Sequence, residues 1–243
     1  MMRAAAILSL VYCLVLTTGA FAQEEGEAPP VTYPDLAETG DDAASFVPTG
    51  WVLEKEIRGD LNKDGADDLV MVLHDTDAAN LIKPDLNMDV PLDTNPRMLA
   101  VAFADKAGGY RLELANSSII PRIQYTNESD PLSEAGGVSI DRGSLVVALY
   151  YFSSSGGSDT GNVTFRFRYE KNDFRLIGYD RYNLNRMSGE IEDVSANFLN
   201  RKVIIKTGTM ESDAEKSTTK RLKSATTVTI GDIADPWVFA PEY

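Results

Sequence analysis

The chain has 243 residues, and its 23 Lys and Arg against 37 Asp and Glu give a formal net charge of −14. Nucleic acid and anionic membrane surfaces repel such a chain, so both are excluded as general partners, whereas divalent cations are attracted. Cys13 is the only cysteine and His74 the only histidine. Disulfides, cysteine nucleophiles and zinc sites with two histidines are therefore excluded from the part that follows residue 22.

Residues 1–22 have the features of a secretory signal peptide. Arg3 supplies the positive start, residues 4–16 form the apolar stretch, and residues 20–22 read Ala-Phe-Ala, a small-x-small cleavage site. The apolar stretch is shorter than the roughly 20 residues that a helix needs to cross a bilayer. The sequence therefore predicts an exported protein without membrane insertion, in the periplasm of a Gram-negative bacterium or outside the cell.

Residues 23–45 form an acidic leader. The early part combines three glutamates with Pro29 and Pro30 and has few large apolar side chains, which predicts partial disorder. Residues 35–45 have the composition of a short helix that ends before Pro48. We expect a single, mainly β domain over residues 46–243.

Apolar residues recur with a period of two along this domain. Strict alternation predicts half-buried strands at residues 51–57, 110–114 and 163–169. Runs that are apolar on both parities predict central strands with two covered faces at residues 69–73, 98–103 and 145–152. Further strands are expected at residues 174–179, 202–206 and 225–230. Turn residues at 62–65, 107–109, 141–143 and 171–173 join neighbouring runs as hairpins, which predicts antiparallel sheet.

The most specific motif begins at Asp60 and reads D-x-N-x-D-G-x-x-D-L. Ca²⁺ takes about six to eight oxygen ligands, and a short loop offers them at alternate positions while a glycine allows the chain to turn around the ion. The motif therefore predicts one Ca²⁺ site. Its ligands are the side chains of Asp60, Asn62 and Asp64, the carbonyl of Ala66 and the carboxylate of Asp68.

The loop differs from an EF-hand, which has a bidentate Glu at loop position twelve and then a helix. Here that position is Met71, within an apolar run typical of a strand. Residues 51–75 resemble the Ca²⁺ loops of FG-GAP/VCBS-type repeats, the β-hairpin units of integrin-like propellers and of many exported bacterial proteins. This resemblance implies that the metal is a structural staple. Only one complete copy is present, which favours one such hairpin over a complete multi-repeat propeller.

No residue qualifies as catalytic from the sequence. His74 follows an apolar run without a G-x-S-x-G turn, and no pair among the many carboxylates can be singled out. Arg166, Arg168 and Arg175 form a basic face that either binds an anionic glycan or acidic partner, or pairs with nearby carboxylates. The aromatic run at residues 150–152 is either core or a sugar-binding surface, and alternation places Tyr150 and Tyr151 on opposite faces.

These observations favour an exported calcium-binding β protein that acts as a non-enzymatic binding or interaction module for a protein or glycan of the cell envelope. Two alternatives remain open. One is a carboxylate-dependent hydrolase that acts on cell-wall glycan, and the other is an inhibitor of an exported enzyme.

Overall fold

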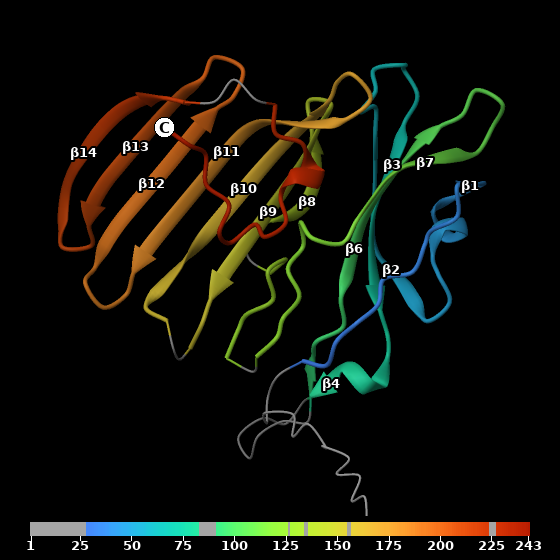
Figure 1. The fold of residues 1–243 in the computed structure, drawn as a ribbon, viewed down its shortest axis with the longest axis horizontal. Coiled ribbons are helices and arrows are strands. Elements are labelled where there is room, and N and C mark those ends of the chain that lie inside the picture. Colours follow the sequence, from blue (N-terminus) through green and yellow to red (C-terminus); the bar gives the residue numbers. More distant parts are fainter. Residues whose placement is uncertain (1–27, 83–90, 126, 134–135, 155–156, 224–226) are drawn as a thin grey trace, which may run out of the picture.

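A computed structural model describes residues 28–82, 91–125, 127–133, 136–154, 157–223 and 227–243. The signal peptide and the first leader residues lie outside the described residues. The protein is mainly β, and its strands pair antiparallel in two large sheets and one small one (Figure 1). No helix in the described ranges is long and apolar enough to cross a membrane.

The first large sheet has five strands in the order β1-β7-β6-β3-β2. Their bounds are β1 (Thr39–Gly40), β2 (Trp51–Gly59), β3 (Asp68–Asp75), β6 (Arg97–Ala104) and β7 (Tyr110–Asn116). Beside it lie the two-stranded sheet of β4 (Leu81–Ile82) and β5 (Leu92–Asp93) and the 3-10 turns η1 (Ala43–Phe46) and η2 (Ala78–Asn80).

The second large sheet has seven strands that run in chain order from β8 to β14. Their bounds are β8 (Gly137–Asp141), β9 (Ser144–Phe152), β10 (Asp159–Tyr169), β11 (Phe174–Asn185), β12 (Glu190–Asn197), β13 (Lys202–Thr209) and β14 (Ser212–Arg221). The sheet curves into a half-barrel, and the C-terminal segment, residues 227–243, crosses its concave side (Figure 1). This segment contains the turn η3 (Ile230–Asp232).

Both faces of the five-stranded sheet are covered. Val70 and Val72 share a core with the seven-stranded sheet, whereas Leu69, Met71 and Leu73 share a second core with the N-terminal segment. The prediction of a central strand at residues 69–73 is confirmed, and β6 follows the same pattern. Because the apolar runs supply side chains to two cores, they show no alternation.

The packed chain begins earlier than the expected residue 46. Tyr33 and Leu36 pack against the same core as Phe46, and β1 pairs with β7. The short helix expected within residues 35–45 is reduced to the 3-10 turn η1, whose N-cap Asp42 accepts a hydrogen bond from the backbone N–H of Ser45. The second half of the leader therefore covers one face of the sheet.

The concave face of the half-barrel is filled by aromatic rings. Phe165 on β10 and Tyr179 on β11 contact Phe239 with ring centroids 5.8 and 5.7 Å apart, and the Tyr179 hydroxyl donates to the Phe239 carbonyl at 3.2 Å. Ile230 is fully buried in the same core. The strand expected at residues 225–230 is wrong over its described part, because Thr229 makes only one isolated bridge and Ile230 opens η3.

Candidate functional site

The predicted metal loop, residues 60–67, connects β2 and β3 in an antiparallel hairpin. Asp60 Oδ1 accepts hydrogen bonds from the backbone N–H groups of Lys63 at 2.6 Å and Asp64 at 3.2 Å, and Oδ2 accepts from Gly65 at 3.0 Å. Lys63 and Gly65 both have positive φ, 66° and 90°. The loop therefore curls around the Asp60 carboxylate, as the glycine in the motif predicts.

Asn62 and Asp64 lie beside Asp60 on this loop. The Asn62 Nδ2 donates to Asp64 Oδ2 at 3.2 Å, and the backbone N–H of Asp64 donates to Asn62 Oδ1 at 2.9 Å. Asp64 Oδ1 accepts from the backbone N–H of Ala66 at 2.9 Å. Three of the predicted ligands thus present oxygens close together at the protein surface, which is the donor chemistry that Ca²⁺ prefers.

Asp68 has a different setting from the other predicted ligands. Its side chain is fully buried, Oδ2 accepts from the backbone N–H of Leu61 at 2.8 Å and of Asn62 at 3.3 Å, and Oδ1 accepts from that of Ala104 at 3.1 Å. Burial raises the pKa of Asp68, and these hydrogen bonds oppose the rise. Asp68 ties the loop to β6. Among the described residues, no group of three or more His, Cys, Asp or Glu side chains is arranged to hold a metal ion.

The basic face expected from Arg166, Arg168 and Arg175 is largely occupied by neighbouring carboxylates. Arg166 Nη1 lies 2.7 Å from Asp141 Oδ2, and Arg168 Nη1 lies 3.2 Å from Glu170 Oε1. Arg175 stands opposite Arg168 in the β10–β11 register and makes no side-chain hydrogen bond or ion pair within the described ranges. Two of the three arginines therefore pair with nearby carboxylates, which is one of the two alternatives for this face.

His74 lies beside a cluster of ion pairs at the end of β3. Its Nδ1 lies 3.7 Å from Glu54 Oε2, and its Nε2 lies 3.8 Å from Asp93 Oδ2. Arg97 links Glu54 to Asp130 with distances of 2.6 and 2.8 Å. The cluster joins β2, β3 and β6 to the segment before β8 and so helps to hold these elements together.

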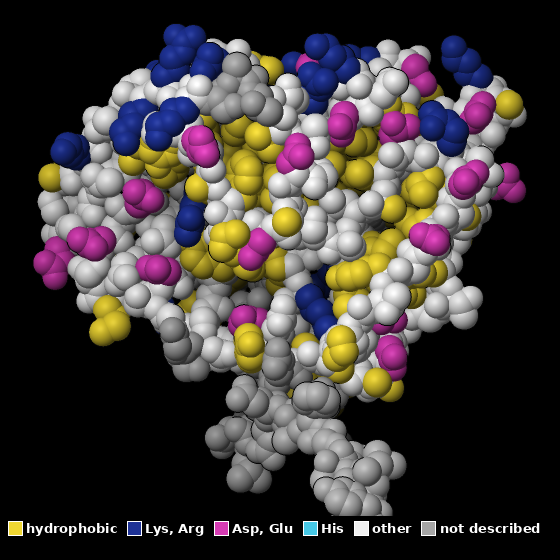
Figure 2. All heavy atoms as spheres, viewed as in Figure 1, with side chains coloured by type: hydrophobic (Ala, Val, Ile, Leu, Met, Phe, Trp, Pro, Cys, Tyr) yellow, Lys and Arg dark blue, Asp and Glu magenta, His cyan; other side chains and the backbone are white. Residues whose placement is uncertain are grey.

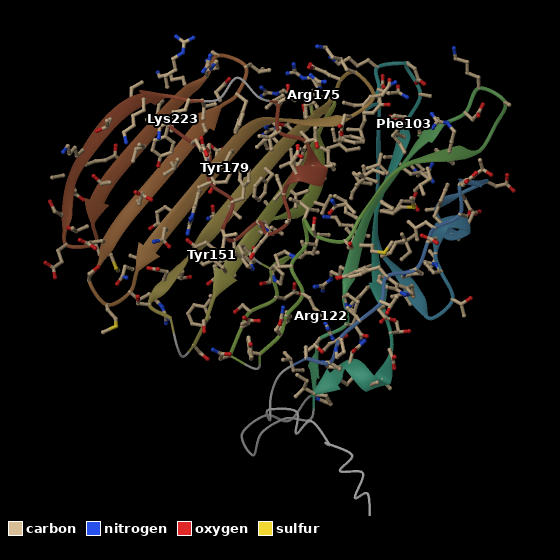
Figure 3. All side chains as sticks on the ribbon, in the orientation of Figure 1. Phe103, Arg122, Tyr151, Arg175, Tyr179 and Lys223 are labelled. Atoms are coloured by element: carbon tan, nitrogen blue, oxygen red, sulfur yellow. The ribbon has the colours of Figure 1, made fainter. Side chains whose placement is uncertain are left out.

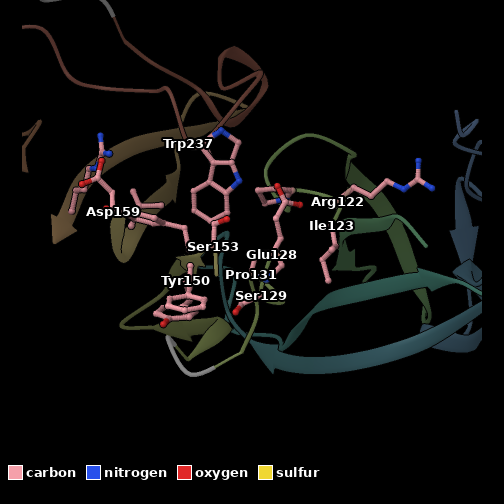
Figure 4. Close-up of a pocket in the computed structure, with 15 residues that line it drawn as sticks. Arg122, Ile123, Glu128, Ser129, Pro131, Tyr150, Ser153, Asp159 and Trp237 are labelled. Atoms are coloured by element: carbon pink, nitrogen blue, oxygen red, sulfur yellow. The ribbon is translucent and has the colours of Figure 1, made fainter. Parts of the chain in front are cut away.

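A cleft of about 230 Å³ opens where the end of β9 meets the C-terminal segment. Its aromatic lining consists of Tyr150, Tyr151, Phe152 and Trp237. Trp237 and Tyr151 make an edge contact, with ring centroids 5.6 Å apart and an interplanar angle of 62°. Figure 4 shows Trp237 and Tyr150 entering this space from different elements. Both tyrosines line the cleft, because it lies at the strand end where the sheet gives way to loops.

Acidic and basic side chains both line the same cleft. Asp159, Arg181 and Glu128 come from β10, β11 and the segment before β8. The Arg181 guanidinium lies 5.8 Å from the centroid of the Tyr151 ring. Glu128 Oε2 accepts from the backbone N–H of Gln124 at 2.8 Å, and Asp159 Oδ1 accepts from Asn185 Nδ2 at 3.1 Å. An apolar cleft with a few convergent polar groups is the usual form of a small-ligand site.

Tyr151 is held in the cleft by its neighbours. Gly161 stands opposite it on β10, and the Tyr151 hydroxyl passes over this glycine to donate to Asn183 Oδ1 and to the Tyr182 carbonyl. Burial raises the pKa of Tyr151, so its phenol stays a hydrogen-bond donor.

Sequence reasoning found the aromatic run of the cleft but missed Trp237, Arg181 and Asp159. Trp237 stands in a segment with no strand or helix periodicity, and only the folded chain brings it to β9. Fold and cleft together define an antiparallel β protein with an aromatic-lined cleft at one end of a half-barrel. Comparison of the chain with protein-family models, curated proteins and solved structures gave no match.

Proposed function

We propose that this chain is an exported, calcium-stabilised binding module that takes a glycan of the cell envelope into the cleft beside Trp237. The observation that carries the proposal is the cleft of about 230 Å³, in which four aromatic side chains stand beside carboxylate and guanidinium groups. Export rests on the signal-peptide features of residues 1–22.

A sugar ring suits this combination of groups. Its C–H faces are apolar and pack on aromatic rings, while its rim carries hydroxyls that exchange hydrogen bonds with carboxylates and amides. Trp237 and Tyr151 provide rings, and Asp159 at the mouth provides acceptors. Partial exposure leaves Trp237 open to a ligand, whereas the core rings Phe165 and Tyr179 are buried.

The test is calorimetric titration with chito-oligosaccharides and with soluble peptidoglycan fragments. Trp237→Ala should weaken binding by about tenfold or more, because the aromatic wall is lost. Trp51→Phe is the matched control, since Trp51 packs against the N-terminal core and lies outside the cleft. Absence of binding to every probe, or equal affinity in the wild type and Trp237→Ala, rejects glycan binding at this cleft.

The calcium part of the proposal rests on the loop that begins at Asp60 and on its resemblance to FG-GAP/VCBS-type repeats. Asp60, Asn62 and Asp64 would hold the ion with the Ala66 carbonyl and Asp68, and Ca²⁺ would neutralise their charge. Because a ligand that binds only the folded state stabilises it, a chelator should lower the melting temperature and added Ca²⁺ should restore it.

Two loop variants separate calcium binding from general loop damage. Asp64→Ala should abolish the Ca²⁺-dependent rise in melting temperature. Asp67→Ala should retain it, because Asp67 is exposed, carries the same charge and is outside the ligand set. Equal melting temperatures with chelator and with Ca²⁺ in the wild type would contradict the metal site.

A carboxylate-dependent hydrolase is the second candidate, because Glu128 and Asp159 line the same cleft. On this alternative, Asp159→Asn abolishes the release of reducing sugar from peptidoglycan fragments while binding persists. Binding without any release of reducing sugar in the wild type favours the module over the hydrolase.

A further inference from the structure

A second cavity, of about 220 Å³, lies at the other end of the half-barrel. Its described walls come from the start of β11, the turn between β12 and β13, and Leu222, Thr227 and Val228. Its charged lining residues are Arg175, Arg201 and Glu170. Figure 3 places Arg175 and Tyr151 toward opposite ends of the half-barrel, so this cavity is separate from the aromatic cleft.

Both arginines of this cavity have an unmatched donor. The Nε atoms of Arg175 and Arg201 are the buried side-chain polar atoms that lack a hydrogen-bond partner in the described part of the chain. Arg201 Nη2 donates to the Leu222 and Lys223 carbonyls at 2.7 and 3.1 Å, which fixes its guanidinium at the cavity. Arg175 has no side-chain partner there, although its backbone is fixed by a bridge to Thr229.

An unmatched buried donor is costly, and the two arginines that carry these donors border the same cavity. A guanidinium carries five N–H donors and no acceptor, so each of these groups needs acceptors around it. Among the described residues that line the cavity, the one carboxylate is that of Glu170, which is already paired with Arg168 at 3.2 Å. Among the described lining residues no second carboxylate is present, which leaves room for an acceptor from outside the chain.

The surroundings of the cavity are basic, although the protein as a whole is acidic. Lys202 follows Arg201 in the sequence, and the Lys223 carbonyl accepts a hydrogen bond from Arg201. Arg221, the last residue of β14, pairs with Lys202 on β13. Figure 2 shows Lys and Arg side chains gathered along the top of the molecule in this view. This local positive charge attracts anions, although the chain as a whole has a net charge of −14.

We infer that this cavity binds a small tetrahedral oxyanion, a phosphate or sulfate group, between Arg175 and Arg201. A tetrahedral group offers oxygens in several directions, so it can accept hydrogen bonds from two guanidinium forks that approach from different elements. Thr227, whose side chain carries a neutral hydroxyl donor, lines the same cavity. This inference does not depend on glycan binding at the aromatic cleft.

The experiment is thermal unfolding of the full chain with sodium phosphate, sodium sulfate and sodium chloride at matched ionic strength. Phosphate and sulfate should raise the melting temperature progressively with concentration, whereas chloride should not. Arg175→Gln should remove this rise and weaken phosphate affinity by about tenfold or more in calorimetry. This variant should fold, because the Arg175 side chain makes no hydrogen bond or ion pair with a described residue and Gln keeps part of its length. Glucose 6-phosphate in a further arm distinguishes a sugar phosphate from free phosphate.

Arg142→Gln is the matched control, because Arg142 carries the same charge with 93% of its side chain exposed. It should keep the full response to phosphate, and Arg201→Gln should lose it. An equal rise in melting temperature with chloride overturns the inference. So does a phosphate response that is the same in Arg175→Gln as in the wild type.

Discussion

Gly161→Ala offers a severe test of how the aromatic cleft is built. Gly161 lies on β10 between Tyr151 on β9 and Asn183 on β11. A Cβ atom at this position would stand 1.9 Å from the Tyr182 carbonyl oxygen and 2.8 Å from the Tyr151 hydroxyl. Both distances are far below van der Waals contact, and the first involves backbone, so the strands must separate or Tyr151 must leave its place.

The expected cost has two parts. Overpacking of a closely packed site costs about 1–3 kcal/mol. Loss of the Tyr151 hydroxyl hydrogen bonds costs about 0.5–1.5 kcal/mol more. The variant should therefore lose roughly 2–4 kcal/mol of unfolding free energy, which for a domain of this size lowers the melting temperature by about 4–16 °C. Displacement of Tyr151 should also reduce ligand binding at the cleft.

Gly178→Ala is the matched control on the neighbouring strand. A Cβ atom there would meet only the side chain of Arg166, at 3.5 Å and beyond, which is ordinary contact. Urea unfolding of both variants measures the difference. If Gly161→Ala unfolds within about 0.5 kcal/mol of Gly178→Ala, the close approach of the three strands is not what fixes Tyr151.

Two further predictions concern charge and the core. Burial raises the pKa of Tyr179 to about 12, so the folded state favours the neutral phenol. The stability that the neutral phenol contributes is complete below pH 10 and is lost as the pH rises from 10 to 12. Urea unfolding from pH 8 to 11 should show a fall above pH 10 that is smaller in Tyr179→Phe, and an unchanged fall would contradict this. Arg97→Met should lower the free energy of unfolding by about 1–3 kcal/mol. Arg97 is 10% exposed, and its loss leaves Glu54 and Asp130 without their ion-pair partner. Arg111→Met, at a side chain 55% exposed, should cost little, and equal losses would refute the reasoning.

The strands that the sequence predicts are those whose side chains enter a core. Alternation marks β10 because Val163, Phe165 and Phe167 all point into the concave core. Unbroken apolar runs mark β3 and β6 because each supplies two cores. The turn at residues 171–173 is equally readable, since Lys171 and Asn172 adopt positive φ in a tight hairpin.

Two of the strands that the sequence misses, β12 and β14, belong to the half-barrel and bury few side chains or none. All ten residues of β14 are exposed, so burial imposes no apolar pattern on Ser212–Arg221. β12 buries only Val194 and Ala196, which is too few for a period to be recognised. Such strands depend on their neighbour for position, and a single sequence does not state which neighbour that is.

In the metal loop too, local spacing predicts the contacts within the loop but not the contacts with distant strands. Spacing alone places the loop in a hairpin and brings Asp60, Asn62 and Asp64 together. The contact of Asp68 with the Ala104 backbone joins residues 36 positions apart, and no local pattern contains it. Trp237 is the stronger case, because its place beside Tyr151 depends on the path of the whole C-terminal segment.

That segment also links the two sites at opposite ends of the half-barrel. Trp237 forms a wall of the aromatic cleft, while Thr227 and Val228 line the cavity of Arg175 and Arg201. Between them, Phe239 packs on Tyr179, and the Lys223 backbone N–H donates to the Glu242 carbonyl at 2.9 Å. One crossing segment thus contributes walls to both the aromatic cleft and the arginine cavity. A change that loosens its central contacts, such as truncation of the Phe239 side chain, should therefore disturb both sites while the pairing of the strands remains.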